Sequence, residues 1–187
     1  ELQQSAGLIE TAGLKATQVV KNLLGSGRKE DFDFEPVDLN DSIQSALMLL
    51  SHEFLSRQIT VQFQRDSEMP QIVASENYLQ SAWINLIMNS IEAIEGEGGE
   101  IRIATKFDGS NFLVKISDNG KGIPAEYLNQ IFEPFFTTKK KNDKGTGLGL
   151  SLVRRVVQSH NGQIQVESEE GHGTSFTIIL PKEQKGK

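Results

Sequence analysis

The chain has 187 residues, the usual length of one globular domain with at most a short additional segment. Its formal net charge of −6 at pH 7 argues against nucleic-acid binding, because that affinity comes largely from basic side chains that neutralise phosphates. The absence of cysteine excludes disulfides, thiol nucleophiles and thiolate metal sites. No apolar run approaches the ~20 residues of a membrane-spanning helix, so we expect no direct membrane contact.

The N-terminal part of the chain carries a heptad pattern, which predicts a coiled-coil helix over residues 1–24. The positions of its seam are Leu2, Ser5, Ile9, Ala12, Ala16, Val19 and Leu23. This seam can pair two chains in a homodimer, or it can pack on the domain of its own chain. Gly7 and Gly13 would each destabilise a lone helix by about 1 kcal/mol, which favours pairing between chains.

A linker rich in Gly, Ser and charged residues is predicted at residues 25–36, before a domain at 37–182 and a tail at 183–187. Helices are predicted at residues 38–57, 75–94 and 148–160, with a short one beginning near Pro124. Strands are predicted at residues 59–64, 72–73, 101–107, 112–117, 163–168 and 174–180. Because helices and strands interleave, we expect an α/β fold, a two-layer sandwich with a mixed sheet and helices on one face.

The helix predicted over residues 75–94 carries a polar stripe within a mostly apolar sequence. Asn85, Asn89 and Glu92 stand at i, i+4 and i+7, so they share one side of the helix. Buried amides must find hydrogen-bond partners, either in the neighbouring backbone or in an enclosed polar space. The second interpretation suits a magnesium ion that bridges phosphates, because an Asn carbonyl is the kind of hard oxygen ligand that Mg²⁺ accepts.

Two glycine-rich segments add further candidates. In the first, Asp118 follows an apolar strand and precedes Gly120 and Gly122, so its carboxylate can accept the exocyclic amino proton of adenine while Ile123 packs on the ring. Asp-Asn-Gly is also an ordinary turn signature. The second segment, residues 144–150, precedes a helix whose first N–H groups can hold phosphate. It is neither a Walker A loop nor a dinucleotide-binding Gly-x-Gly-x-x-Gly motif.

Taken in order, five segments resemble the motifs of the Bergerat-fold (GHKL) ATPases, and among these the sensor histidine kinases of the nitrogen-regulator-like subgroup. The segments are residues 85–93 (N box), 118–124 (first glycine box), 132–139 (F box), 144–150 (second glycine box) and 171–176 (the closing Gly-x-Gly-Thr-x-Phe element). The resemblance implies a Bergerat fold that uses ATP and Mg²⁺. It also implies that residues 1–24 are the second helix of a dimerisation domain.

Site residues follow from the resemblance position by position. It implies that Asn89 binds Mg²⁺, that Asn85 orders the phosphates and the metal, and that Asp118 binds the adenine amino group with support from Thr174. The other implied ATP contacts are Gly120, Gly122, Ile123, Phe132, Lys139, Lys144, Gly145, Thr146, Gly147, Leu148 and Gly149. Residues 132–145 would form a lid whose lysines either face solvent or neutralise the triphosphate. Glu92 departs from the basic residue of many relatives, and its role stays open.

The residue at position 85 separates two kinds of reaction. Hydrolytic relatives have a Glu there that activates water, whereas Asn85 cannot act as a general base. The resemblance therefore implies a cytoplasmic protein-histidine kinase that transfers the γ-phosphate of ATP to a His, and from there to an Asp in the receiver domain of a response regulator. An alternative is an ATP-dependent conformational switch of the chaperone or mismatch-repair type, and another is a nucleotide-free scaffold, which the complete glycine boxes disfavour.

The family's acceptor His belongs to a His-Glu-x-x-x-Pro-like segment on the first dimerisation helix, which would precede residue 1. His52 and Glu53 match the beginning of that segment, but Arg57 stands where Pro is needed. His160 precedes Asn-Gly and indicates a helix end, and His172 lies between two loop glycines. We therefore expect the acceptor outside residues 1–187, with any membrane anchor of the parent protein upstream.

Overall fold

The computed structural model describes residues 33–138 and 146–183. The predicted coiled-coil helix, most of the predicted linker, the end of the predicted tail and the candidate residues Lys139, Lys144 and Gly145 lie outside the described residues.

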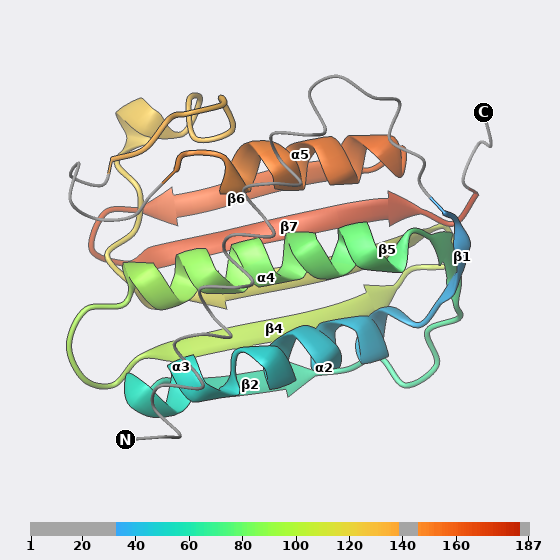
Figure 1. Ribbon diagram of the computed structural model, residues 1–187, viewed down its shortest axis with the longest axis horizontal. Helices are drawn as coiled ribbons and strands as arrows, with labels where there is room; N and C mark the ends of the chain where they lie inside the picture. The colour runs from blue at the N-terminus through green and yellow to red at the C-terminus, as the bar shows by residue number, and fades with distance from the viewer. Residues whose placement is uncertain (1–32, 139–145, 184–187) are drawn as a thin grey trace. The chain divides into compact units, whose positions relative to one another are not determined.

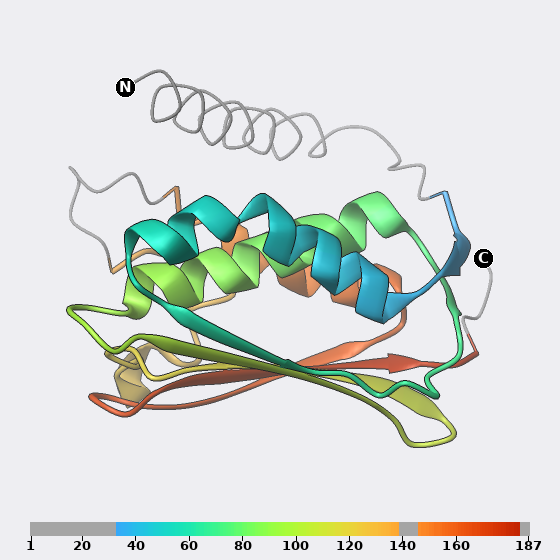
Figure 2. The same ribbon diagram turned by 90° about the horizontal axis from the view of Figure 1, so that it is seen from below.

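The described elements form two layers, a mixed sheet with helices over one of its faces (Figures 1 and 2). In chain order they are β1 (Glu35–Val37), α2 (Leu39–Leu49), α3 (Ser51–Ser56), β2 (Thr60–Gln64), β3 (Ile72–Ala74), α4 (Glu76–Ala93), β4 (Glu100–Phe107), β5 (Asn111–Asp118), the 3-10 helix η1 (Ala125–Tyr127), α5 (Gly149–Ser159), β6 (Gln163–Glu169) and β7 (Gly173–Pro181). The five-stranded sheet has the order β2-β4-β5-β7-β6, and only its β2–β4 pair is parallel. This arrangement confirms the predicted two-layer α/β sandwich.

Within the described residues, none of the helices combines the length and the apolar content that crossing a membrane requires.

Two elements differ from the sequence-based expectation. The single helix predicted at residues 38–57 is instead two helices, α2 and α3, which meet at Leu50 with φ −98° and ψ 6°. Leu50 and Phe54 are both buried at this junction. In addition, the last two residues assigned to the linker, Glu35 and Pro36, belong to β1, which pairs antiparallel with β3. A three-residue strand that contains proline carries too little periodicity to be recognised.

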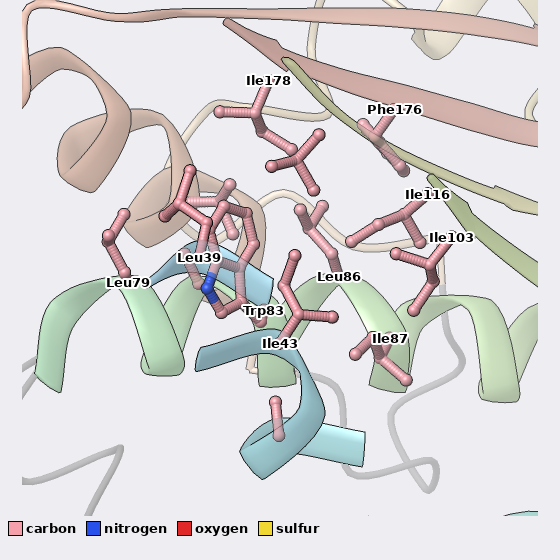
Figure 3. Close-up of a cluster of buried hydrophobic side chains, with 14 of the residues drawn as sticks. Leu39, Ile43, Leu79, Trp83, Leu86, Ile87, Ile103, Ile116, Phe176 and Ile178 are labelled. Carbon is pink, nitrogen blue, oxygen red and sulfur yellow. The ribbon is translucent and has the colours of Figure 1, made fainter. Parts of the chain in front are cut away.

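The core lies between the helices and the sheet. Figure 3 shows side chains of two helices beside side chains of three strands. They are Leu39 and Ile43 of α2, Leu79, Trp83, Leu86 and Ile87 of α4, Ile103 of β4, Ile116 of β5, and Phe176 and Ile178 of β7. Each such buried side chain contributes about 1.5–3 kcal/mol relative to exposure. This apolar contact fixes how α4 is rotated against the sheet, and it leaves Asn85 and Asn89 half-buried beside the contact.

Strand periodicity determines which polar residues reach the helix layer. Phe112, Val114 and Ile116 of β5 are buried, and side chains of a strand alternate between its two faces. Asp118 continues this series at the end of the strand, so it points toward the helices. Thr174 begins the corresponding series on β7, where it pairs with Asp118. The fold therefore brings a carboxylate and a hydroxyl together at one end of the sheet, on the side of α4.

Candidate functional site

Asp118 is held as a hydrogen-bond acceptor at the end of β5. Its Oδ1 accepts from the backbone N–H of Gly120 at 3.0 Å and of Thr174 at 3.3 Å. Burial raises the pKa of Asp118, while the Gly120 N–H, the nearby Ser90 hydroxyl and the Thr174 N–H lower it by less. Because both backbone bonds reach the same oxygen, Oδ2 stays available for a further donor.

The loop after Asp118 is fixed between α4 and the turn that joins β6 to β7. A Cβ atom on Gly120 would lie 2.7 Å from the carbonyl of Ala93, and the same carbonyl accepts the Lys121 N–H at 2.9 Å. Gly122 has φ +69°, and a Cβ there would lie 2.0 Å from the carbonyl oxygen of Glu169. Only glycine fits either position, since backbone lies on the side where a Cβ would stand.

Ser168 connects this loop to Thr174. Its Oγ accepts the Ile123 N–H at 2.8 Å, donates to the Gly173 carbonyl at 2.8 Å and lies 2.9 Å from Thr174 Oγ1. Ser168 was missed in the sequence analysis, although a signal existed. It follows Ile164 and Val166 on the inward-facing positions of β6, where a polar residue is unexpected.

The two asparagines of α4 differ in their surroundings. Asn85 Nδ2 donates to the Ser81 carbonyl at 2.7 Å, and a Cβ on Gly149 would lie 2.8 Å from Asn85 Oδ1. Asn85 thus faces the first turn of α5 at close range. Asn89 Nδ2 is buried and has no hydrogen-bond partner among the residues that the structure describes. The Asn85 amide is therefore satisfied by backbone, and the Asn89 amide is not.

The start of α5 has no side-chain cap. Its N-cap residue, Leu148, makes no side-chain hydrogen bond, so the first N–H groups of the helix stay available to an anion. Gly147 has φ +66°, and a Cβ there would lie 2.5 Å from the carbonyl carbon of Phe135. The Phe135 N–H in turn donates to the Gly147 carbonyl at 2.9 Å. Thr146, just before it, is exposed.

Aromatic contacts anchor the segment before this turn. The Phe132 ring meets Phe176 edge-on with centroids 6.4 Å apart, and the Arg154 guanidinium lies 5.9 Å from the Phe132 centroid. The Phe136 ring lies 5.7 Å from that of Tyr127. Phe132 is therefore part of the packing at this end of the domain. Phe135, by contrast, is 73% exposed.

The structure brings most of the predicted site residues to one end of the sandwich. Asn85 and Asn89 come from α4, Asp118 and Gly120 from the end of β5 and its loop, Gly147 and Gly149 from the start of α5, and Thr174 from β7. Glu92 is half-buried near the end of α4. Sequence reasoning also missed Ser90, which is 2% exposed on α4. A serine between Ile87 and Ile91 on the apolar side of a helix was the available signal.

The three histidines have different surroundings. His52 is exposed on α3, and His172 is exposed in the turn between β6 and β7. His160 is fully buried; its Nδ1 lies 2.7 Å from the Val156 carbonyl, and its Nε2 accepts the Ser75 N–H at 3.0 Å. This pattern requires a neutral ring protonated on Nδ1. Burial lowers the pKa of His160, which agrees with a structural role.

The chain is similar in sequence to a known protein family and to individual proteins. A family model described as "Histidine kinase-, DNA gyrase B-, and HSP90-like ATPase" matches residues 74–184. The chain is 38% identical over 181 residues to the sensor histidine kinase ZraS of Escherichia coli (strain K12), an alignment that covers 97% of this chain and 38% of ZraS. It is 35% identical over 170 residues to the signal transduction histidine-protein kinase AtoS of the same strain, covering 90% of this chain and 27% of AtoS.

Two solved structures of histidine kinases are also similar to this chain. A nucleotide-free form of the catalytic domain of histidine kinase ThkA has a TM-score of 0.71 and 35% identity, covering 80% of this chain and 95% of that chain. Histidine kinase ThkA in complex with the response regulator protein TrrA has a TM-score of 0.76 and 28% identity, covering 100% of this chain and 53% of that chain. The chain itself spans less than two fifths of the length of ZraS or AtoS.

Proposed function

Because the chain belongs to the histidine kinase-, DNA gyrase B- and HSP90-like ATPase family, we propose that it binds ATP between α4, the loop after Asp118 and the start of α5. The observation that carries this proposal is a buried polar atom, Asn89 Nδ2, that has no hydrogen-bond partner among the described residues. Leaving such an atom unpaired costs about 1–3 kcal/mol. A bound polar ligand would recover that cost.

The base would lie against Asp118. Its carboxylate is held by two backbone N–H groups and keeps Oδ2 available, which suits an acceptor for the 6-amino group of adenine. Thr174 and Ser168 would complete the polar edge of this pocket, with Gly120, Gly122 and Ile123 shaping its wall. Guanine presents a carbonyl at the same position, and a carboxylate would repel it. The site should therefore prefer ATP to GTP.

The phosphates would lie between Asn85 and the uncapped first turn of α5, where Thr146, Gly147, Leu148 and Gly149 present backbone. Phe132, Lys139, Lys144 and Gly145 would also contact the nucleotide, and the two lysines would neutralise its charge. Asn89 carries one amide oxygen and one NH₂ group, so a magnesium ion on the oxygen and a phosphate on the NH₂ would satisfy both. Such an ion would neutralise charge on the transferred phosphoryl group.

Magnesium would take its remaining ligands from phosphate and water. Within residues 33–138 and 146–183, no group of three or more His, Asp or Glu side chains gathers in a way that could hold a metal. Asn89 alone is enough for this role, because Mg²⁺ commonly keeps several waters and binds few protein oxygens when phosphates are present.

The reaction we propose is transfer of the γ-phosphate to a His, with onward transfer to a response regulator. Asn85 cannot activate water, which argues against hydrolysis and against a hydrolytic conformational switch. His160 is buried with both ring nitrogens engaged, so it cannot receive a phosphoryl group. We place the acceptor His on another segment of the parent protein, on the cytoplasmic side of the cell, where ATP is made.

We further propose that the heptad seam of residues 1–24 pairs two parent chains, so that the catalytic domain and the acceptor belong to one homodimer. Two apolar seam positions, Ile9 and Val19, provide the test. Replacing both with Asp should remove any dimer in sedimentation without changing ATP affinity. A dimer that survives this change would contradict the proposed seam.

The transfer reaction can be tested with a separate domain that carries the first dimerisation helix and acceptor His of the parent protein. With radiolabelled ATP, the unmodified chain should label that domain and show no labelling of its own. Asn89→Ala should reduce the labelling rate by about 100-fold or more, because the metal and phosphate lose their contact on α4. The matched control is Asn77→Ala, an exposed Asn on the same helix.

Two results would overturn the proposed reaction. One is steady ATP hydrolysis without any acceptor at the rate of the transfer reaction. The other is acid-labile phosphate on His52 of the chain alone. If Asn77→Ala and Asn89→Ala reduced labelling equally, the assignment of Asn89 would also be wrong.

A further inference from the structure

Ser90 behaves unlike four other helical serines of this chain. Ser56, Ser81, Ser151 and Ser159 each donate to a backbone carbonyl three or four residues earlier, at 2.7–3.1 Å. This bond is the usual way in which a helix satisfies a serine hydroxyl. Ser90 is 2% exposed, and its Oγ makes no such bond to the backbone of α4. Its hydroxyl is therefore not used to satisfy its own helix.

The position of Ser90 places its hydroxyl beside Asp118. Ser90 precedes Ala93 by three residues, so the two lie on the same side of α4. Ala93 contacts the loop after Asp118, through Gly120 and through the Lys121 N–H. The hydroxyl also lowers the pKa of Asp118, which agrees with this proximity. Ser90 interacts with the Asp118 carboxylate, but the pair lies outside ordinary hydrogen-bond geometry, so the hydroxyl can turn to a better acceptor.

A donor next to an acceptor matches one edge of adenine. Adenine presents an amino donor at position 6 and a ring acceptor at N1, whereas guanine presents an acceptor and a donor in the same places. Asp118 supplies the acceptor, and its Oδ1 is already engaged by backbone. A serine hydroxyl supplies a donor. Neither group alone reads both atoms of the edge.

We propose that Ser90 is a specificity-determining residue of the nucleotide site, whose hydroxyl donates to adenine N1 while Asp118 accepts from the 6-amino group. This inference rests on the proposed ATP site and adds to it a second contact with the base. This contact would give the buried hydroxyl a hydrogen bond of ordinary geometry, which its contact with Asp118 lacks. It also explains how the site reads N1, an atom that a carboxylate cannot contact favourably.

The experiment is a double-mutant cycle between protein and ligand, run by calorimetry on the full 187-residue chain. The ligands are ATP and 1-deaza-ATP, in which N1 is replaced by CH. The unmodified chain should bind 1-deaza-ATP about fivefold to tenfold more weakly than ATP. Ser90→Ala should bind both ligands with the same weakened affinity. The control is Ser56→Ala, whose hydroxyl lies on α3, and it should retain the full preference for ATP.

Ser90→Ala should unfold at about the same temperature as the unmodified chain, since it removes only a poorly oriented contact with Asp118. If that variant fails to fold, Ser90→Cys offers a weaker donor of similar size, and it should show a reduced preference for ATP. Equal binding of ATP and 1-deaza-ATP by the unmodified chain would overturn the inference, and so would a Ser90→Ala chain that keeps the preference. Both results leave ATP binding itself intact. Failure of the proposed function would appear differently, as no ATP binding at all by the unmodified chain.

Discussion

Two polar clusters differ in whether the protein satisfies them. One lies near the end of β4 and the other at the end of β5, and these antiparallel strands end on opposite sides of the sheet (Figure 1). The first joins α2, β4 and the loop after β2. Thr105 Oγ1 donates to Asn40 Oδ1 at 2.7 Å and accepts the Asp66 N–H at 3.0 Å. Asn40 Nδ2 donates to the Asp66 carbonyl at 3.0 Å, and Asp66 Oδ2 accepts the Phe107 N–H at 2.8 Å. Each of these polar groups has a partner within the chain.

The second cluster, at the other end, is only partly satisfied. Asn89 Nδ2 has no partner among the described residues, and Ser90 Oγ contacts Asp118 only outside ordinary hydrogen-bond geometry. Asp118 uses one oxygen for both of its backbone bonds. Both clusters have similar residue types and similar burial, so composition does not separate them. They differ in hydrogen bonding. The first, which we call the closed cluster, has every hydrogen bond made and holds elements of the fold together, whereas the second, the open cluster, has donors and acceptors left for a ligand.

The largest expected effect comes from removing the acceptor of the open cluster. Asp118→Asn keeps an oxygen for the Gly120 and Thr174 N–H groups, but it presents an NH₂ group to the 6-amino group of adenine. ATP affinity should fall by about 100-fold or more, or about 2.7 kcal/mol, in calorimetry.

The stability of the same variant provides the control. Because burial raises the pKa of Asp118, the folded state binds more protons than the unfolded state between the two pKa values, and stability falls as pH rises through that window. Removing the charge should therefore leave the unfolding temperature at neutral pH unchanged or raise it. A variant that loses ATP binding because it unfolds would contradict the separation of the two clusters.

The closed cluster should respond in the opposite way. Thr105→Val keeps the shape of the side chain but removes both hydroxyl bonds, leaving Asn40 Oδ1 and the Asp66 N–H unpaired. The free energy of unfolding should fall by about 2 kcal/mol, while ATP affinity stays the same. Urea denaturation measures the first quantity and calorimetry the second. Thr60→Val, at an exposed position of β2, should change neither. A Thr105→Val chain with weakened ATP binding and full stability would contradict the assignment of the closed cluster to stability and the open cluster to ligand binding.

His160 extends the comparison to a polar group that is satisfied in only one protonation state. Its Nε2 accepts the Ser75 N–H only while the ring is neutral, and burial lowers its pKa. Since the folded pKa lies below the unfolded one, the unfolded state binds more protons in between, and stability should be lost as pH falls below about 6.5.

The size of the His160 effect is at most about 1.4 kcal/mol for each pH unit in that window. His160→Gln should reduce this part of the pH dependence in urea denaturation between pH 5 and pH 8. His52→Gln, at an exposed position, should retain it. The same slope in both variants would show that His160 is not the group that titrates.

The residues of the open cluster could be predicted from the sequence, whereas those of the closed cluster could not. Asp118 follows an alternating strand and precedes glycines, and Asn85 and Asn89 stand one helical turn apart, so spacing alone indicates their common side. The Asn40–Asp66–Thr105 network joins residues far apart in the chain, with no local pattern to reveal it. His160 is a similar case, since its interpretation as a helix end gives no hint of its bond to Ser75. Ser90 has ordinary helical spacing, and its burial beside Asp118 becomes visible only in three dimensions.

The most direct test of the central claim, that the open cluster binds an adenine nucleotide, is a calorimetric comparison of ATP and GTP on the unmodified chain with Mg²⁺ present. Asp118 accepts from the 6-amino group of adenine and repels the corresponding carbonyl of guanine, so ATP should bind at least about 100-fold more tightly than GTP. Equal affinity for the two nucleotides would contradict the account, because the partly unsatisfied groups of α4 and β5 would then not be reading the base.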